Sequence, residues 1–164
     1  MPDEETPHAS GGAASVSPTG RSAAERPTGW LSVTACLVLT AQAATVGLWA
    51  AFFPNSFFQD FPGVLGQRWF TEHDTYDEHL VRDVGTLHLA LLVPTVGAIV
   101  KRVPDRLVGW MWVPMALPHA WFHANHLEGL APSEQYATMA GLISVVAASV
   151  FLASRRKATH ATSG

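Results

Sequence analysis

The sequence predicts an all-α integral membrane protein, an antiparallel four-helix bundle with an interfacial loop between its first and second helices. Of its 164 residues, 48% are hydrophobic and 14% are charged, whereas roughly 25% are charged in soluble domains. Four apolar stretches carry almost none of this charge, and each is about long enough to cross a hydrocarbon core of about 30 Å. We expect one transmembrane domain, residues 29–154, with spans at about 30–53, 84–100, 107–123 and 134–153.

The two ends of the chain differ from this domain in composition. Residues 1–28 are rich in Ser, Pro, Gly, Ala and Thr, which bury too little apolar surface to offset chain entropy, so we expect a disordered cytoplasmic tail. Residues 155–164 form a short basic tail. The net charge of −3 argues against a nucleic-acid partner. Cys36 is the only cysteine, so no intrachain disulfide or cysteine-based metal cluster can form, and we expect this thiol to be an inert packing residue.

The first apolar run extends from Trp30 to Phe53 and is bounded by aromatic residues, which is typical of an anchored transmembrane helix. A cleaved signal peptide is the alternative, because two arginines precede the run and residues 41–43 resemble a cleavage site. The run continues past Ala43, which favours a retained helix.

Residues 54–74 form a long connection in which aromatic and polar side chains alternate. Two interpretations are equally open: the segment lies in the membrane interface, or its aromatic side chains cap the core of the bundle. The aromatic residues concerned are Phe57, Phe58, Phe61, Trp69 and Phe70.

The second helix is expected to begin near Tyr76, with Thr75 as N-cap and Glu78 reaching back in a capping box, and to end near Val100. Pro94 should kink it. A basic link then leads to the third span, where Pro114 and Pro118 free two backbone carbonyls. Such breaks line sites in some membrane proteins and lack a function in others.

A turn over residues 125–133 precedes the fourth helix, which should begin at Ser133 or Glu134 and end near Ala153. Small residues recur along this helix, which predicts close packing against a neighbour.

Charge asymmetry predicts the topology. With four spans, one side of the membrane receives eight of the ten Lys and Arg residues, and by the positive-inside rule that side is cytoplasmic. We therefore expect a multi-pass plasma-membrane protein with both termini in the cytoplasm. The basic residues on that side are Arg21, Arg26, Lys101, Arg102, Arg106, Arg155, Arg156 and Lys157.

Three histidines lie at helical spacing near the outer end of the third span. At 100° per residue, His123 and His126 lie about 40° and about 20° from His119 around the helix. The topology brings them near the start of the second helix, so Glu78 and Asp83 are further candidate ligands for zinc, copper or iron. A haem would need fewer protein ligands, and His88 is the natural partner of His119. His126 lies at the margin of the turn, which makes it the weakest member.

A purely structural interpretation is equally open. Glu78 with Arg82, and His79 with Asp83, have the i, i+4 spacing of helical ion pairs. Arg82 could alternatively hold an anionic ligand or a lipid headgroup. His79 and His88 are nine positions apart, so they should point to opposite faces of the helix.

The ten-residue pattern Tyr76-Asp77-Glu78-His79-Leu80-Val81-Arg82-Asp83-Val84-Gly85, followed by an apolar helix and a His-rich span, resembles small uncharacterised bacterial four-helix membrane proteins. In broad architecture the chain is also similar to the DoxX-like group. The resemblance implies a four-helix membrane bundle and carries no catalytic residue over to this chain.

Three functional hypotheses follow from these patterns. The first is a metal- or haem-binding, redox-related accessory protein with a His and carboxylate cluster at the outer membrane face. The second is a non-catalytic scaffold that binds lipids or partners, and the third is a small proton- or ion-handling protein. Expected partners are the lipid bilayer and either further copies of this chain or other membrane proteins. The sequence does not decide whether the protein is an enzyme.

Overall fold

The computed structural model describes residues 26–62, 75–127 and 130–155, and these residues form helices and turns without an extended strand ladder. The all-α expectation is thus confirmed for this part of the chain. In order, the helices are α1 (Arg26–Phe52), the short α2 (Pro54–Asp60), α3 (Glu78–Ile99), α4 (Asp105–Ala124) and α5 (Pro132–Ser154).

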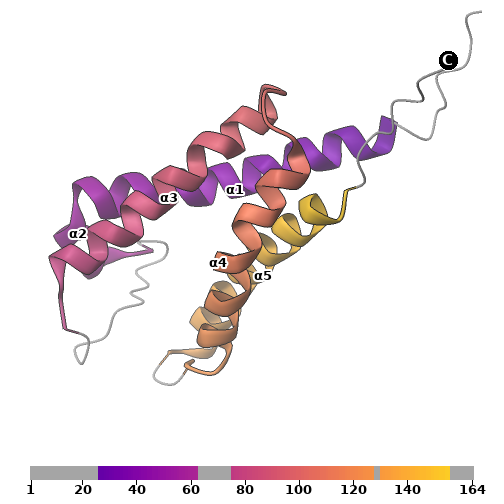
Figure 1. Ribbon diagram of the computed structural model, residues 1–164. Helices are drawn as coiled ribbons and strands as arrows, with labels where there is room; N and C mark the ends of the chain where they lie inside the picture. Colours follow the sequence, from indigo (N-terminus) through magenta and orange to yellow (C-terminus); the bar gives the residue numbers. More distant parts are fainter. Residues whose placement is uncertain (1–25, 63–74, 128–129, 156–164) are drawn as a thin grey trace, which may run out of the picture.

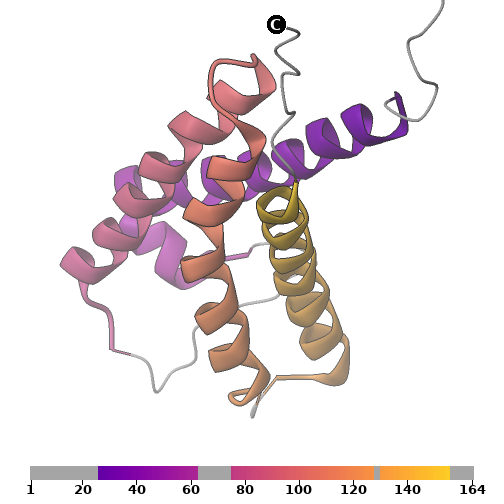
Figure 2. The same cartoon turned by 45° about the vertical axis from the view of Figure 1, so that its right-hand side comes forward.

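The four long helices form two pairs. α1 lies along α3 and α4 lies along α5, whereas α1 meets α5, and α3 meets α4, over a much shorter length. Figures 1 and 2 show that the pairs meet near the α3–α4 turn and diverge toward α2 and the α4–α5 turn. The contacts describe two helix pairs, and the four-helix bundle that we expected stays a prediction.

Two glycines allow the helices within each pair to approach closely. A Cβ atom on Gly85 of α3 would lie 2.3 Å from the backbone nitrogen of Ala51 in α1. On Gly109 of α4 it would lie 2.1 Å from the backbone nitrogen of Ala153 in α5. Small residues at both contacts therefore set the spacing of each pair, as such residues do in membrane helix packing.

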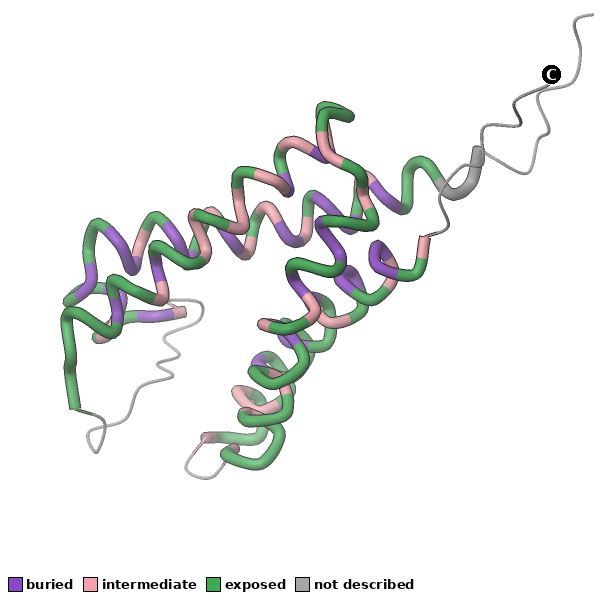
Figure 3. Tube along the Cα trace, in the orientation of Figure 1, coloured by how far each residue is buried: buried purple, intermediate pink, exposed green. Residues whose placement is uncertain are grey.

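The main core lies where the two pairs meet, and its largest member is Trp112 of α4, which is fully buried. The Trp112 indole Nε1 donates a 2.9 Å hydrogen bond to Thr95 Oγ1 of α3, and that hydroxyl donates to the Leu91 carbonyl at 2.7 Å. Cys36 is also buried there, as expected of a packing residue. Figure 3 shows that buried residues thin out toward the far ends of α4 and α5.

Basic side chains gather at the end of the molecule where the pairs meet, which we call the basic end. Asp105, at the start of α4, lies 3.7 Å from Lys101 Nζ and 3.9 Å from Arg155 Nε. Arg106 Nε donates to the Ala153 carbonyl at 3.3 Å. The α3–α4 turn and the end of α5 are therefore joined at one end, as the antiparallel topology requires.

The opposite end, which we call the cavity end, comprises α2, the start of α3, the end of α4 and the start of α5. A second apolar cluster there packs Phe57 of α2 and Phe61, which follows α2, against Val46 of α1 and Val81 of α3. The ring centroids of Phe57 and Phe61 are 4.5 Å apart. Of the two interpretations of this connection, core capping holds for these two side chains, while Trp69 and Phe70 lie outside the described residues.

Two predicted helix starts were wrong. α1 begins at Arg26, although we expected a disordered tail as far as residue 28. α3 begins at Glu78 with Asp77 as N-cap, whose carboxylate accepts a 3.1 Å hydrogen bond from the Leu80 amide. The Asp77 side chain is short enough to accept directly from the free amide three residues later. Glu78 does not reach back as we expected and pairs with Arg82.

Within the described ranges, three helices are long and apolar enough to cross a membrane: α1 from Gly29 to Phe52, α3 and α5. α4 is not one of them, although its span was expected at residues 107–123. Its charged first turn, two prolines and two histidines lower its mean hydropathy. By length and composition, these three helices could therefore cross a membrane.

Candidate functional site

A cavity of about 440 Å³ lies between the two helix pairs, on the side where they diverge. This volume falls within the range of about 300–1,000 Å³ that is usual for small-molecule and cofactor sites. All five helices contribute to its wall, which is mainly apolar. Its apolar lining includes Val46, Phe57, Phe61, Val81, Phe122 and Val145.

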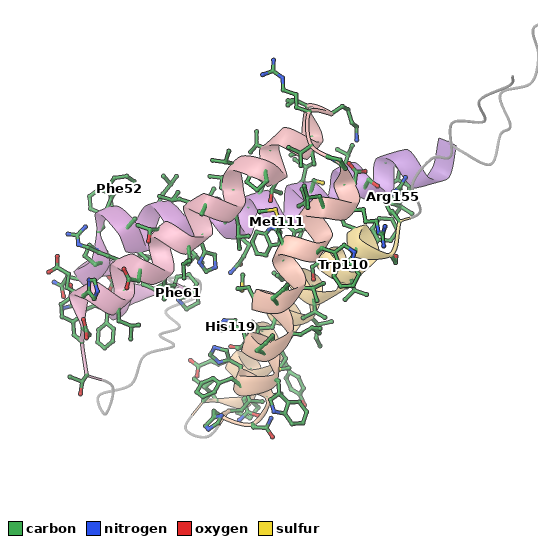
Figure 4. All side chains as sticks on the ribbon, in the orientation of Figure 1. Phe52, Phe61, Trp110, Met111, His119 and Arg155 are labelled. Atoms are coloured by element: carbon green, nitrogen blue, oxygen red, sulfur yellow. The ribbon has the colours of Figure 1, made fainter. Side chains whose placement is uncertain are left out.

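Three imidazoles line this cavity: His88 of α3, and His119 and His123 of α4. The rings of His119 and His123 meet edge to face with centroids 4.7 Å apart. Figure 4 shows His119 on the side of α4 that faces α2 and α3, while Trp110 lies on the opposite side of that helix. The histidines of α4 that we ranked highest thus face the α1–α3 pair.

His88 is held in a defined orientation. Its Nδ1 lies 2.8 Å from the Val84 carbonyl oxygen one turn earlier in α3, and a carbonyl can only accept, so Nδ1 carries the proton. In the neutral ring, Nε2 then presents a lone pair. The His88 ring also meets the Trp112 ring edge to face at 6.4 Å, so the cavity is anchored to the main core through this residue.

Two polar groups on the cavity wall have no hydrogen-bond partner among the described residues: the ring nitrogens of His119 and the amide of Gln42 in α1. A polar group in an apolar wall is costly unless something satisfies it. These groups are therefore available to a bound molecule.

The remaining predicted site residues lie outside the cavity wall. Arg82 Nε lies 2.8 Å from Glu78 Oε1, and Arg82 also donates to the Ala51 carbonyl at the end of α1. His79 lies 3.5 Å from Asp83 and its side chain is 88% exposed. The i, i+4 ion pairs therefore form as the structural interpretation predicted. His79 and His88 lie on different faces of α3, also as predicted.

His126 follows the end of α4, its ring stacked on Phe122 with centroids 4.2 Å apart and its Nδ1 at 2.8 Å from the Phe122 carbonyl. Within the described ranges, no group of three or more His, Cys, Asp or Glu side chains is placed to hold a metal ion. The predicted set of His119, His123, His126, Glu78 and Asp83 is therefore not brought together.

Sequence reasoning did not find the apolar half of the site. Gly141, Leu142 and Val145 of α5 line the cavity opposite the histidines, but their small-residue pattern predicted only helix packing. Gln42 was the available signal, because a carboxamide in the middle of an apolar span has a high desolvation cost. Comparison with models of protein families, with curated proteins and with solved structures finds no match for this chain.

Proposed function

We propose that the protein is a multi-pass plasma-membrane protein that binds one small, largely apolar molecule in the cavity between its two helix pairs. In this proposal the basic end faces the cytoplasm, and the cavity lies in the outer half of the bilayer. The observation that carries the proposal is an apolar cavity of about 440 Å³ into which three imidazoles project.

Charge supports this choice of ligand. Among the described residues no Lys or Arg lines the cavity, and the one carboxylate there, that of Asp77, already caps α3. The imidazoles and the Gln42 amide offer hydrogen bonds or lone pairs to a neutral group. A molecule with an apolar body and a few polar or electron-accepting atoms complements such a wall.

The test is native mass spectrometry of protein purified from its own membranes into lipid nanodiscs, with wild type compared to Gly141→Trp. A Cβ at Gly141 would have nothing within 4 Å, so an indole can enter the cavity and displace its occupant. We expect one tightly bound molecule per wild-type chain and its loss from Gly141→Trp.

Ile143→Trp is the matched control, because Ile143 is 59% exposed on another face of the same helix and does not line the cavity. It should retain the bound molecule. Wild-type protein that carries only the bulk lipids of the nanodisc, in the same amount as Gly141→Trp, would overturn the proposal.

The scaffold hypothesis keeps one observation in its favour. The polar residues at the start of α3 satisfy one another or the end of α1, since Arg82 bridges Glu78 and the Ala51 carbonyl. In a scaffold the histidines would serve the same structural purpose. Equal ligand content in wild type and Gly141→Trp, together with capture of a defined membrane partner, is the result that favours this alternative. The likeness to the DoxX-like group also remains a proposal.

A further inference from the structure

We propose that the molecule in this cavity is a haem whose iron is ligated by His88 of α3 and His119 of α4. This inference rests on the proposed function, because it names the ligand class of the same cavity. The two residues lie on different helix pairs and line one cavity. A ligand held between them would thus join the pairs where they otherwise diverge.

The hydrogen bond of His88 is the first argument. Histidines that ligate metals almost always donate their other ring N–H to a carboxylate, a water or a backbone carbonyl, which fixes the ring and its tautomer. His88 Nδ1 lies 2.8 Å from the Val84 carbonyl oxygen and therefore leaves Nε2 as a lone-pair donor. A hydrogen-bond acceptor such as a carbonyl could not use that lone pair, whereas a metal centre could.

The availability of His119 is the second argument. Among the described residues neither of its ring nitrogens has a hydrogen-bond partner, although it lies beside His123. His119 is exposed in the structure, so its ring nitrogens are accessible to a ligand, and in a bilayer an imidazole without a partner is costly to keep. Ligation of iron satisfies one nitrogen and leaves the other for water or a backbone carbonyl.

The number of ligands separates haem from a free metal ion. Zinc in proteins usually has four ligands, and three of them come from the protein even in catalytic sites. The described residues contain no group of three or more His, Cys, Asp or Glu placed for this. A haem supplies four nitrogens itself and needs only one or two side chains. Two imidazoles in an apolar wall suit a porphyrin and do not suit a free ion.

The wall itself fits a flat apolar macrocycle. Phe57 of α2, Phe61 just after α2 and Phe122 of α4 line the cavity and provide aromatic surface against which a porphyrin can pack. Thr75, shortly before α3, also lines it. Carboxylate substituents of the ring can therefore reach the polar end of the cavity, toward the membrane surface.

The test is a titration of the full-length protein in lipid nanodiscs with hemin, followed by absorption and electron paramagnetic resonance spectroscopy. We expect one hemin per chain and the six-coordinate, low-spin spectrum of a bis-imidazole haem. His88→Ala and His119→Ala should each abolish that spectrum and weaken hemin binding at least about tenfold. His79→Ala is the control, because this side chain is 88% exposed and, among the described residues, pairs with Asp83 alone.

Chemical rescue distinguishes ligation from a structural role. Added imidazole should restore the low-spin spectrum in His119→Gly, and His88→Met should give the distinct spectrum of a His and Met pair. A wild-type spectrum unchanged in both alanine variants, or no saturable binding of hemin, would overturn the inference. If native mass spectrometry then still finds another molecule that Gly141→Trp displaces, the proposed function stands without haem. If Gly141→Trp displaces nothing, both fail.

Discussion

The basic end and the cavity end of the molecule are built on different principles. At the basic end the helix pairs meet around Trp112, and the contact of Gly109 with Ala153 brings backbones together. At the cavity end the pairs diverge, and the polar groups His119 and Gln42 project into an apolar space without hydrogen-bond partners among the described residues.

This difference separates stability from binding. Helices fixed at one end can hold an open site at the other, because the histidines of the site need not contribute to the fold. The histidines of α4 then serve ligand binding, while Trp112 of the same helix stabilises the packing. Substitutions at the basic end should therefore lower the free energy of unfolding, and substitutions at the cavity end should change what the protein binds.

The largest effect is expected from Trp112→Ala. This change leaves a void in the main core and should lower the free energy of unfolding by about 3–5 kcal/mol. Trp121→Ala, in the same helix but 74% exposed, should change it by less than about 0.5 kcal/mol. Reversible unfolding in detergent, followed by circular dichroism, measures both. Equal losses of unfolding free energy in Trp112→Ala and Trp121→Ala would contradict the proposed difference between the two ends of α4.

A pair of glycine substitutions compares the two ends with the same added atom. In Gly109→Ala the new Cβ would meet the Ala153 backbone at 2.1 Å, so the helices must separate, at a cost of about 1–3 kcal/mol. In Gly141→Ala it enters open space, and higher helix propensity should stabilise the protein by up to about 1 kcal/mol. Opposite signs of the change in thermal midpoint are the expected result, and a loss in both variants would contradict it.

A smaller effect is expected from the charges of the basic end. Asp105 bridges Lys101 and Arg155, and its side chain is 18% exposed. Asp105→Asn should cost at most about 1 kcal/mol, and less as salt is added. Asp83→Asn breaks only the exposed pair with His79 and should be neutral. Denaturant titrations at low and high salt provide the measurement. A larger loss of stability in Asp83→Asn than in Asp105→Asn would contradict this prediction.

The helices were predictable because hydrophobic run length and helix caps are local properties of the sequence. The ten-residue pattern 76–85 also carried correct structural information, although its purpose became clear only in three dimensions. Asp77 caps α3, Arg82 reaches the end of α1, and Gly85 allows the two helices to touch. The pattern therefore docks α3 on α1, and Asp77, Leu80, Val81 and Val84 within it also line the cavity.

The candidate site was predictable only in part. Helical spacing and topology together placed His88, His119 and His123 at one end of the bundle, and these three do line one cavity. Spacing alone could not exclude Glu78 and Asp83, because their rotation about α3 depends on how α3 packs on α1. The divergence of the helix pairs also could not be predicted from the sequence, because it depends on long-range contacts that leave no periodicity there.

The measurement that tests the separation of stability from binding most directly is made on the double variant His119→Ala, His123→Ala. Its bound-molecule content, from native mass spectrometry, and its thermal midpoint after removal of the ligand are compared with those of wild type. The two-ended account predicts a near-complete loss of the bound molecule with a midpoint within a few degrees of ligand-free wild type. Unchanged content together with a large fall in the midpoint would show that the histidines serve the fold, and would contradict the account.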